Sequence, residues 1–258
     1  MRTSRSKART EPRGQAELKK RLVEASWILA MEGHGDLVWG HASVRAPGSD
    51  TFWIKPTGMG LDEVRVEDLL LCDLDGEVVQ GTGPRHIEVY IHSEVMRARP
   101  DVCAVVHTHA IHPTVFASLG VPLQPVTHEA TVFVPPDISR FDETTDLINT
   151  PERGRTMAHA LGNRDALLLV SHGIVTSGTT IERAAINALL LDRATRAQLL
   201  LGNAPIKVVS NEADGLAKRK LLLSDAHQAL RWGYLKRDLA RKRGETEGSL
   251  KGPGRGRR

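Results

Sequence analysis

The chain has 258 residues, of which 40% are hydrophobic. That length suffices for one large α/β domain. With no uninterrupted apolar run of about 18 residues, we expect no membrane span, and the basic first ten residues lack the apolar segment of a secretory signal. The two cysteines, Cys72 and Cys103, lie in apolar strand-like segments, which predicts reduced thiols in a cytoplasmic protein.

The net charge of +4 is unevenly distributed along the chain. Residues 1–21 carry eight Lys/Arg and two Glu, and residues 236–258 carry nine Lys/Arg and three Asp/Glu. Each end therefore has a net charge of +6, and the 214 residues between them have a net charge of −8. We therefore predict a basic disordered arm at 1–14, a folded domain at 15–240 and a basic Gly/Arg-rich tail at 241–258. An acidic body argues against a specific nucleic-acid-binding face.

The hydrophobic pattern predicts a mixed α/β sandwich, with helices before, between and after strands. A helix at 15–33 is followed by strands within 37–46 and 51–58 and by a hairpin at 69–81 that turns at Asp75-Gly76. Next come a helix at 86–98, a strand at 101–109, helices at 113–120 and 156–163, and two strand runs within 166–178. A long helix capped by Thr179 and Glu182 runs to about 201, and one or two helices follow at 213–240. No GxGxxG follows a strand, so a dinucleotide-binding fold is not supported.

Two histidines stand in an apolar strand, in the segment CAVVHTHAIHP (103–113). Because side chains alternate along a strand, His107 and His109 share one face and could bind one divalent metal. A lone HxH also fits a pair of hydrogen-bonded core histidines. His112, next to Pro113 at a helix start, is interpreted as a surface or capping residue.

Two further segments favour the metal. His172 lies between the two strand runs of LLLVSHGIV (167–175), flanked by the small Ser171 and Gly173. Glu88 precedes the HxH strand on the helix of RHIEVYIHSEV (85–95), with His92 one turn later. His92 fits either a partner of Glu88 or a packed core residue. Imidazoles with a carboxylate suit zinc, manganese, iron or cobalt.

These segments, taken in order, resemble the class II aldolase/adducin family, which has the fold of fuculose-phosphate aldolase. The resemblance covers about residues 17–205 and rests on GHASVR, KPTG, EDLLLCDLDGEVVQG, Glu88 with a His four residues later, RARPDVCAVVHTHA and DALLLVSHGIVTSG. It implies a three-layer α/β/α sandwich around a mainly antiparallel sheet.

The resemblance also implies one divalent metal ion per subunit, with zinc favoured, on His107, His109, His172 and Glu88. Glu88 matches the acid that is both fourth ligand and proton shuttle. Members commonly form homotetramers with active sites at subunit interfaces. The implied reaction is a lyase reaction on a small molecule, a retro-aldol cleavage or a decarboxylation that leaves an enolate.

The sequence differs from those of the family's sugar-phosphate aldolases at positions that bind the substrate phosphate. Those members bind phosphate through an Asn, a Thr-Gly turn and a Ser-Ser pair before the catalytic Glu. Here Thr57-Gly58 is kept, but His41 replaces the Asn and His86-Ile87 replaces the Ser-Ser pair. His41, His86 and Arg85 could pair with a carboxylate.

A His in PVTHEA, here His128, resembles members that act on carboxylated acids. We therefore predict a carboxylated or non-phosphorylated 2-oxo or hydroxy substrate, with substrate contacts from these residues. A sugar-phosphate aldolase and a non-catalytic, adducin-like interaction module remain alternatives.

The remaining prominent side chains are interpreted as structural. We expect His34 and His159 at the surface, Trp39 and Trp53 in the core and Arg45 tying its strand to a neighbour. Lys55 fits either a substrate contact or a solvent-facing residue.

Overall fold

The computed structural model describes residues 13–244 and contains one eight-stranded sheet in the order β4-β3-β2-β1-β5-β8-β7-β6. Every neighbouring pair is antiparallel except β6 with β7, which confirms the mainly antiparallel sheet. The strands are β1 (His41–Arg45), β2 (Thr51–Ile54), β3 (Leu70–Asp73), β4 (Val78–Gln80), β5 (Ala104–Thr108), β6 (Ser139–Phe141), β7 (Ala166–Leu169) and β8 (Gly173–Gly178).

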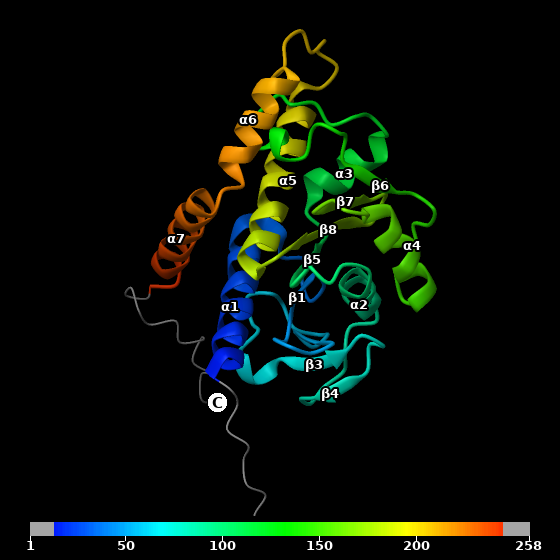
Figure 1. Cartoon of the computed structure of the whole chain (residues 1–258), viewed down its shortest axis with the longest axis vertical. Helices are drawn as coiled ribbons and strands as arrows, with labels where there is room; N and C mark the ends of the chain where they lie inside the picture. The colour runs from blue at the N-terminus through cyan, green and yellow to red at the C-terminus, as the bar shows by residue number, and fades with distance from the viewer. Residues whose placement is uncertain (1–12, 245–258) are drawn as a thin grey trace, which may run out of the picture.

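Helices cover both faces of the sheet (Figure 1). They are α1 (Arg13–Leu29), α2 (Val89–Ala98), α3 (Ile111–Leu119), α4 (Pro151–Leu161), α5 (Ile181–Leu201), α6 (Glu212–Leu222) and α7 (Asp225–Lys242). A π-helical turn, η1 (Ala30–His34), extends α1, and two 3-10 turns are η2 (Val66–Asp68) and η3 (Ala130–Val132). The predicted α/β/α sandwich is therefore confirmed.

Two separate apolar cores fill the spaces between these layers. One contains buried residues of α1, α3, α5 and α7, and the other contains buried residues of α2 and α4. Strand β5 contributes to both because its side chains alternate: Ala104 and Val106 enter the first core, and Val105 enters the second. Each fully buried Val, Leu or Ile side chain in these cores stabilises the fold by about 1.5–3 kcal/mol.

Strand β5 lies in the middle of the sheet, with β1 and β8 on either side. Its register pairs His107 with His41 of β1 and with Val175 of β8. All five residues of β5 are buried, so the imidazole of His107 has no exposure to solvent. The predicted HxH strand is therefore a central strand of the sheet, and it ends between the two histidines.

Several predicted boundaries needed correction. Glu88 is the N-cap residue of α2 and precedes its first helical residue. The cap of α5 is Thr180, whose side chain accepts a hydrogen bond from the Arg183 N–H, and it replaces the predicted Thr179. The C-terminal segment is a pair of helices, and the hairpin at 69–81 forms as predicted.

Two residues were assigned to the wrong environment. Trp39 is 53% exposed and pairs with Asp36 in an isolated antiparallel bridge, whereas Trp53 is fully buried. His34 is buried and hydrogen-bonds through Nδ1 to the Thr108 hydroxyl at 2.9 Å, so it is not a surface residue. Arg45 donates to the carbonyls of Met96 and Val102, as expected of a structural residue.

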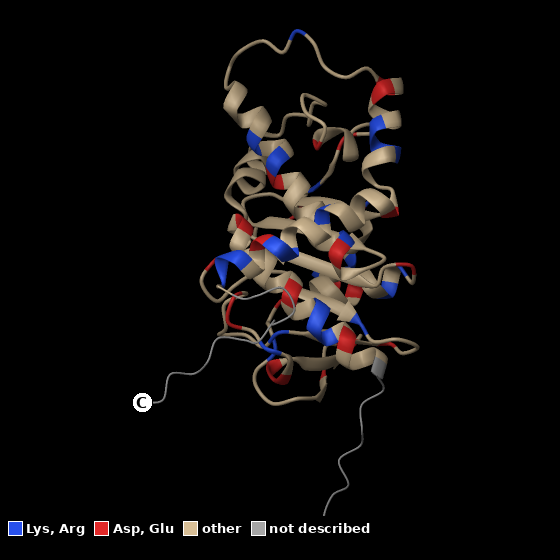
Figure 2. Ribbon diagram, turned by 90° about the vertical axis from the view of Figure 1, so that its left-hand side faces the viewer, with Lys and Arg blue, Asp and Glu red and all other residues tan. Residues whose placement is uncertain are grey.

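The predicted terminal segments lie mostly outside the described residues. Helix α1 already begins at Arg13, and α7 continues to Lys242, so the folded part extends slightly beyond 15–240 at both ends. Along the ribbon in Figure 2, Lys and Arg positions are interspersed with Asp and Glu positions. Within residues 13–244, no helix is long and apolar enough to cross a membrane.

Candidate metal centre

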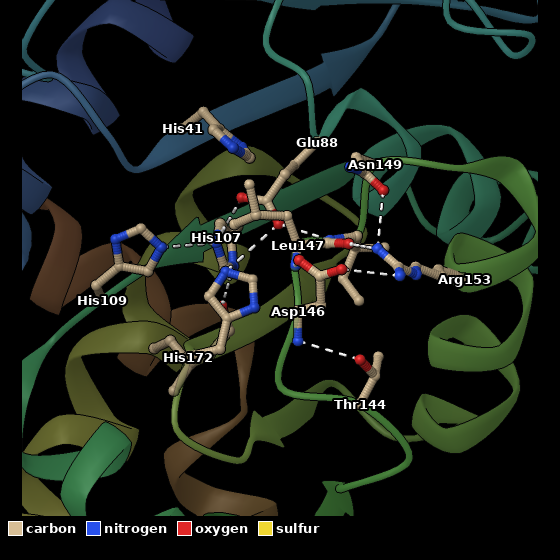
Figure 3. A network of polar contacts seen from close by, with 12 residues as sticks. His41, Glu88, His107, His109, Thr144, Asp146, Leu147, Asn149, Arg153 and His172 are labelled. Atoms are coloured by element: carbon tan, nitrogen blue, oxygen red, sulfur yellow. Dashed lines mark hydrogen bonds and ion pairs between the residues drawn. The ribbon is translucent and has the colours of Figure 1, made fainter.

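Four side chains from three parts of the chain meet at one end of β5 (Figure 3). His107 is in β5 and His109 follows its end, His172 lies in the turn between β7 and β8, and Glu88 caps α2. Each of the four side chains offers one ligand atom, and these four atoms all lie within 4.8 Å of one another. Within residues 13–244, this is the group of side chains whose spacing suits a metal ion. The sequence had predicted these four residues as the ligands.

The turn that carries His172 depends on its two small neighbours. Ser171 has a positive φ of 57°, which non-glycine residues seldom adopt outside functional sites and turns. At Gly173, a Cβ would lie 2.5 Å from the Thr108 carbonyl oxygen and 2.9 Å from Cδ2 of His109. The absence of a side chain at Gly173 therefore allows β8 to approach the His109 ring closely.

The hydrogen bonds of the histidines leave lone pairs facing one another. The Nδ1–H of His107 donates to the Ile174 carbonyl at 2.9 Å, and the Nδ1–H of His109 donates to Oδ2 of Asp36 at 2.8 Å. In the neutral form of each ring, the Nε2 is bare, and these two atoms lie 3.0 Å apart. Two lone pairs at that distance repel unless a proton or a cation lies near both.

His172 completes the set of donors. Its Nε2 is buried and makes no hydrogen bond among the described residues, although it lies 3.4 Å from Oε1 of Glu88. A buried nitrogen without a hydrogen bond is costly, and metal coordination removes that cost. Three imidazole nitrogens with one carboxylate therefore fit a divalent transition metal, and the Asp36 and Ile174 acceptors orient two of the rings.

Glu88 carries the negative charge of the cluster. Its Oε1 accepts the Ile148 N–H at 2.8 Å, and its Oε2 lies 3.8 Å from Nε2 of His107. Burial alone raises the pKa of this carboxyl, but the contacts with His172, His107 and the Ile148 N–H outweigh burial and lower it to about 2. Burial also lowers the pKa of His107 well below 6.5, so that ring stays in the neutral form that binds metal.

A second group of buried basic side chains lies beside the cluster. His41 packs against His107 and His86, with ring centroids 5.0 and 4.3 Å away. Lys55 donates to the carbonyls of Val38 and Met59 and lies 3.0 Å from Nε2 of His86. The Lys55 side chain is therefore buried and held by protein groups, and it does not face solvent.

Burial is also the main cause of the low pKa values in this second group. It lowers the pKa of Lys55 to about 8, and together with the nearby Lys55 it lowers the pKa of His86 to about 3. The pKa of His92 falls to about 3 for the same reason, with His86 adding to the effect.

Only some of the other residues predicted to contact substrate lie close to one another. Thr57 and Gly58 lie in a turn joined to the Arg85 segment, because the Thr57 N–H donates to the Pro84 carbonyl at 3.0 Å. Arg85 is half-buried and donates to the His86 carbonyl. His128 is exposed in a groove between α5 and α7 that none of the four candidate ligands lines.

The contributions of Asp36 and Ile148 to this centre, and the location of Lys55, were not predicted from the sequence. Asp36 belongs to GHGDLVW, whose spacing indicates no ligand, and Ile148 acts through its backbone N–H. Leu37, with a positive φ of 48°, follows Asp36 in the tight loop that brings the carboxylate to His109.

Comparison with known proteins identifies the family to which this chain belongs. Residues 20–199 match the family model described as Class II Aldolase and Adducin N-terminal domain. The chain belongs to this class II aldolase/adducin family. The resemblance seen in the sequence is thereby confirmed.

Relatives and solved structures of the class II aldolase/adducin family are similar over much of the chain. The Meiotically up-regulated gene 14 protein of Schizosaccharomyces pombe is 35% identical over 186 residues, 71% of this chain and 72% of the relative. Decarboxylase NovR of Streptomyces niveus is 37% identical over 59% of this chain, and the chain matches only 57% of that protein. The L-fuculose 1-phosphate aldolase of Glaciozyma antarctica superimposes with a TM-score of 0.80 at 29% identity, over 93% of this chain and 95% of that one.

In this class II aldolase family member, we expect Asp36→Asn to weaken metal binding by about 10–100-fold, because the acceptor that orients His109 is lost. Competition with a chromophoric chelator measures the effect. Asp192→Asn is the matched control, since Asp192 accepts from Nδ1 of His112 at 2.9 Å outside the cluster. Equal metal affinity in Asp36→Asn and the wild type would show that Asp36 has no such role.

Gly173→Ala is expected to destabilise the protein by about 1–3 kcal/mol, since the new methyl group meets a backbone oxygen that cannot move freely. The same contact displaces the His109 ring, so metal affinity should fall as well. Chemical denaturation and the chelator assay measure the two effects. Gly202→Ala is a poor control because of its positive φ, whereas Gly14→Ala, in open space on α1, should leave metal affinity unchanged and should not lower stability, since alanine favours a helix over glycine.

Proposed function

We propose that the protein is a divalent-metal-dependent C–C lyase that cleaves or decarboxylates a carboxylated, non-phosphorylated 2-oxo or hydroxy compound. The supporting observation is the convergence of Glu88, His107, His109 and His172, with a buried Nε2 of His172 that lacks a hydrogen bond. An adducin-like interaction module would have no need of such a set.

The bound cation and the Glu88 carboxylate would have different roles in the reaction. A divalent cation held by them would act as a Lewis acid on the substrate carbonyl and lower the energy of negative charge developing beside it. Glu88 is ionised at neutral pH, so its carboxylate can accept a proton from the substrate and return it. Burial of Glu88 and His107 excludes bulk water from the proton being transferred.

The substrate class is inferred from what surrounds the centre. His86 and Ile87 stand directly before Glu88, where sugar-phosphate aldolases of the family have hydroxyl groups, and His86 is already engaged by Lys55. A phosphate dianion would therefore lack donors there, whereas Arg85 and His41 remain to bind a carboxylate. Similarity to Decarboxylase NovR agrees with this choice.

A sugar-phosphate aldolase is the second candidate. It is favoured by the retained Thr57-Gly58 turn and by similarity to a 5-methylthioribulose-1-phosphate/5-deoxyribulose-1-phosphate aldolase of Rhodospirillum rubrum, 33% identical over 67% of this chain and 76% of that protein. The two candidates differ in the anion that the substrate carries, so one substrate panel separates them.

We further propose zinc as the metal, with manganese, cobalt or iron as substitutes, in a cytoplasmic homotetramer. Three imidazoles and a carboxylate suit zinc, and the free Cys72 and Cys103 suit a reducing compartment. Because His128 lies in a separate groove, it could contact substrate only from a neighbouring subunit. Light scattering of the purified protein tests the tetramer.

The test combines metal analysis with the substrate panel. We expect about one divalent ion per chain, and turnover of 2-oxo or hydroxy acids well above that of fuculose, rhamnulose or methylthioribulose phosphates. Rates for those phosphates typical of dedicated enzymes, about 1–1000 per second, would favour the second candidate. Purified protein that binds no divalent ion would favour the interaction module.

A further inference from the structure

A chain of three buried side chains runs from strand β1 through α2 and back to the metal centre. The Ser43 hydroxyl lies 2.6 Å from Nδ1 of His92, and Nε2 of His92 lies 2.6 Å from Nδ1 of His41. Ser43 and His92 have no exposed surface, and His41 has 2%. Phe52 stacks against the His92 ring at 6.2 Å and holds its orientation.

The direction of these hydrogen bonds follows from where the serine proton can go. A neutral imidazole donates through one nitrogen and accepts through the other. Within residues 13–244, the Ser43 hydroxyl has His92 as its hydrogen-bond partner and no other acceptor. If Ser43 accepted from His92, its own buried O–H would be unsatisfied, which is costly. Ser43 therefore donates to Nδ1 of His92.

The remaining protons are then determined in turn. With Nδ1 of His92 accepting, its Nε2–H donates to Nδ1 of His41. With Nδ1 of His41 accepting, the proton of that ring is on Nε2. This nitrogen makes no hydrogen bond with any residue that the structure describes, and the His41 ring points from β1 toward Glu88 and His107 (Figure 3).

We propose that Ser43 and His92 position His41 as a hydrogen-bond donor, with Nε2–H directed at a negatively charged oxygen of the ligand beside the metal centre. A fixed donor there favours a carboxylate or an oxygen that gains charge, and it disfavours a ligand N–H at the same place. The identity of the ligand rests on the proposed function. The positions of the protons do not, because they follow from the protein alone.

The proton positions are measured in metal-free protein labelled with ¹⁵N at histidine. Protonated and bare imidazole nitrogens resonate far apart, and His41→Gln and His92→Gln assign the signals. We expect a protonated Nε2 and a bare Nδ1 in both His41 and His92. A bare Nε2 in His41, or a protonated Nδ1 in His92, overturns the proposal.

Ser43 is tested in the same spectra. In Ser43→Ala, Nδ1 of His92 loses its donor, so its resonance should move toward that of a free bare nitrogen, while Ser43→Thr should keep the wild-type position. Ser26→Ala is the matched control, because this buried serine on α1 donates to the Leu22 carbonyl and has no other side-chain hydrogen bond to the part of the chain that the structure describes. An unchanged His92 resonance in Ser43→Ala overturns the role of Ser43.

The donor is tested by the binding of oxalate to zinc-loaded protein. His41→Gln keeps an N–H donor near the same place and His41→Leu removes it, so oxalate should bind about 10-fold more weakly to His41→Leu than to His41→Gln. Equal affinity of the two variants overturns the direction of the donor. If the wild type itself fails to bind oxalate while the ¹⁵N spectra agree, the proposed function fails and the proton positions stand.

Discussion

Replacing His172 by alanine is expected to abolish tight metal binding and to lower the stability of the metal-free protein less than replacing His107 does. Structural zinc sites with four ligands supply about 10–16 kcal/mol, so losing one ligand should cost about 3 kcal/mol or more, at least about 100-fold in metal affinity. In the metal-free protein the Nε2 of His172 makes no hydrogen bond among the described residues, so its removal takes none away. Metal analysis and thermal unfolding with and without zinc measure the two effects.

His159→Ala is the control for this experiment, since His159 is exposed on α4 and outside the cluster. It should match the wild type in metal content and in stabilisation by zinc. His107→Ala should lose metal as His172→Ala does, but it should destabilise the metal-free protein more strongly, because it breaks the bond to the Ile174 carbonyl and leaves a gap in β5. Full zinc content in His172→Ala would remove the basis of the proposed function.

Replacing Glu88 by glutamine is expected to lower kcat by about 100- to 10,000-fold, the range found when a positioned acid or base is lost. Glutamine keeps the shape and can still accept the Ile148 N–H at its carbonyl oxygen, so the fold should be retained. Metal affinity should fall less than in His172→Ala, because the three imidazoles remain. Steady-state kinetics with the best acid of the panel and the chelator assay give the two numbers.

Glu94→Gln provides a matched control for the loss of a buried carboxylate on the same helix. Glu94 is buried and lies 3.4 Å from Arg97, away from the four candidate ligands. It should change stability slightly and leave kcat unchanged. If Glu88→Gln kept the wild-type kcat, proton transfer would have to be assigned to another group, and His41 would be the first to examine.

The four residues of the candidate metal centre could be singled out from the sequence because most of them occur in local patterns. Alternation along a strand places His107 and His109 on one face, and the small residues around His172 indicate a tight turn. Both patterns depend only on neighbours in the chain. The family resemblance then connected these segments with Glu88, although the periodicity placed Glu88 inside a helix that it in fact caps.

The surroundings of the centre could not be predicted in the same way. Asp36 reaches His109 from 73 positions away, and Ser43 reaches His92 from 49 positions away. No local pattern indicates either contact, because each depends on how β1 pairs with β5 and how α2 packs on that pair. The same packing buries His34 and Lys55, two residues whose polarity alone predicts exposure.

The sequence by itself indicated most of the strands and helices in order, although not β6, and the two faces of β5, since these follow from local periodicity. The candidate ligands were indicated by residue chemistry together with the family resemblance. Only the tertiary structure decided which ring nitrogens face the centre, which side chains orient them and which of the predicted substrate contacts remain available. The physical reason is that a buried polar group must find its hydrogen-bond partner wherever the fold brings one, and that partner is set by packing between segments far apart in the chain.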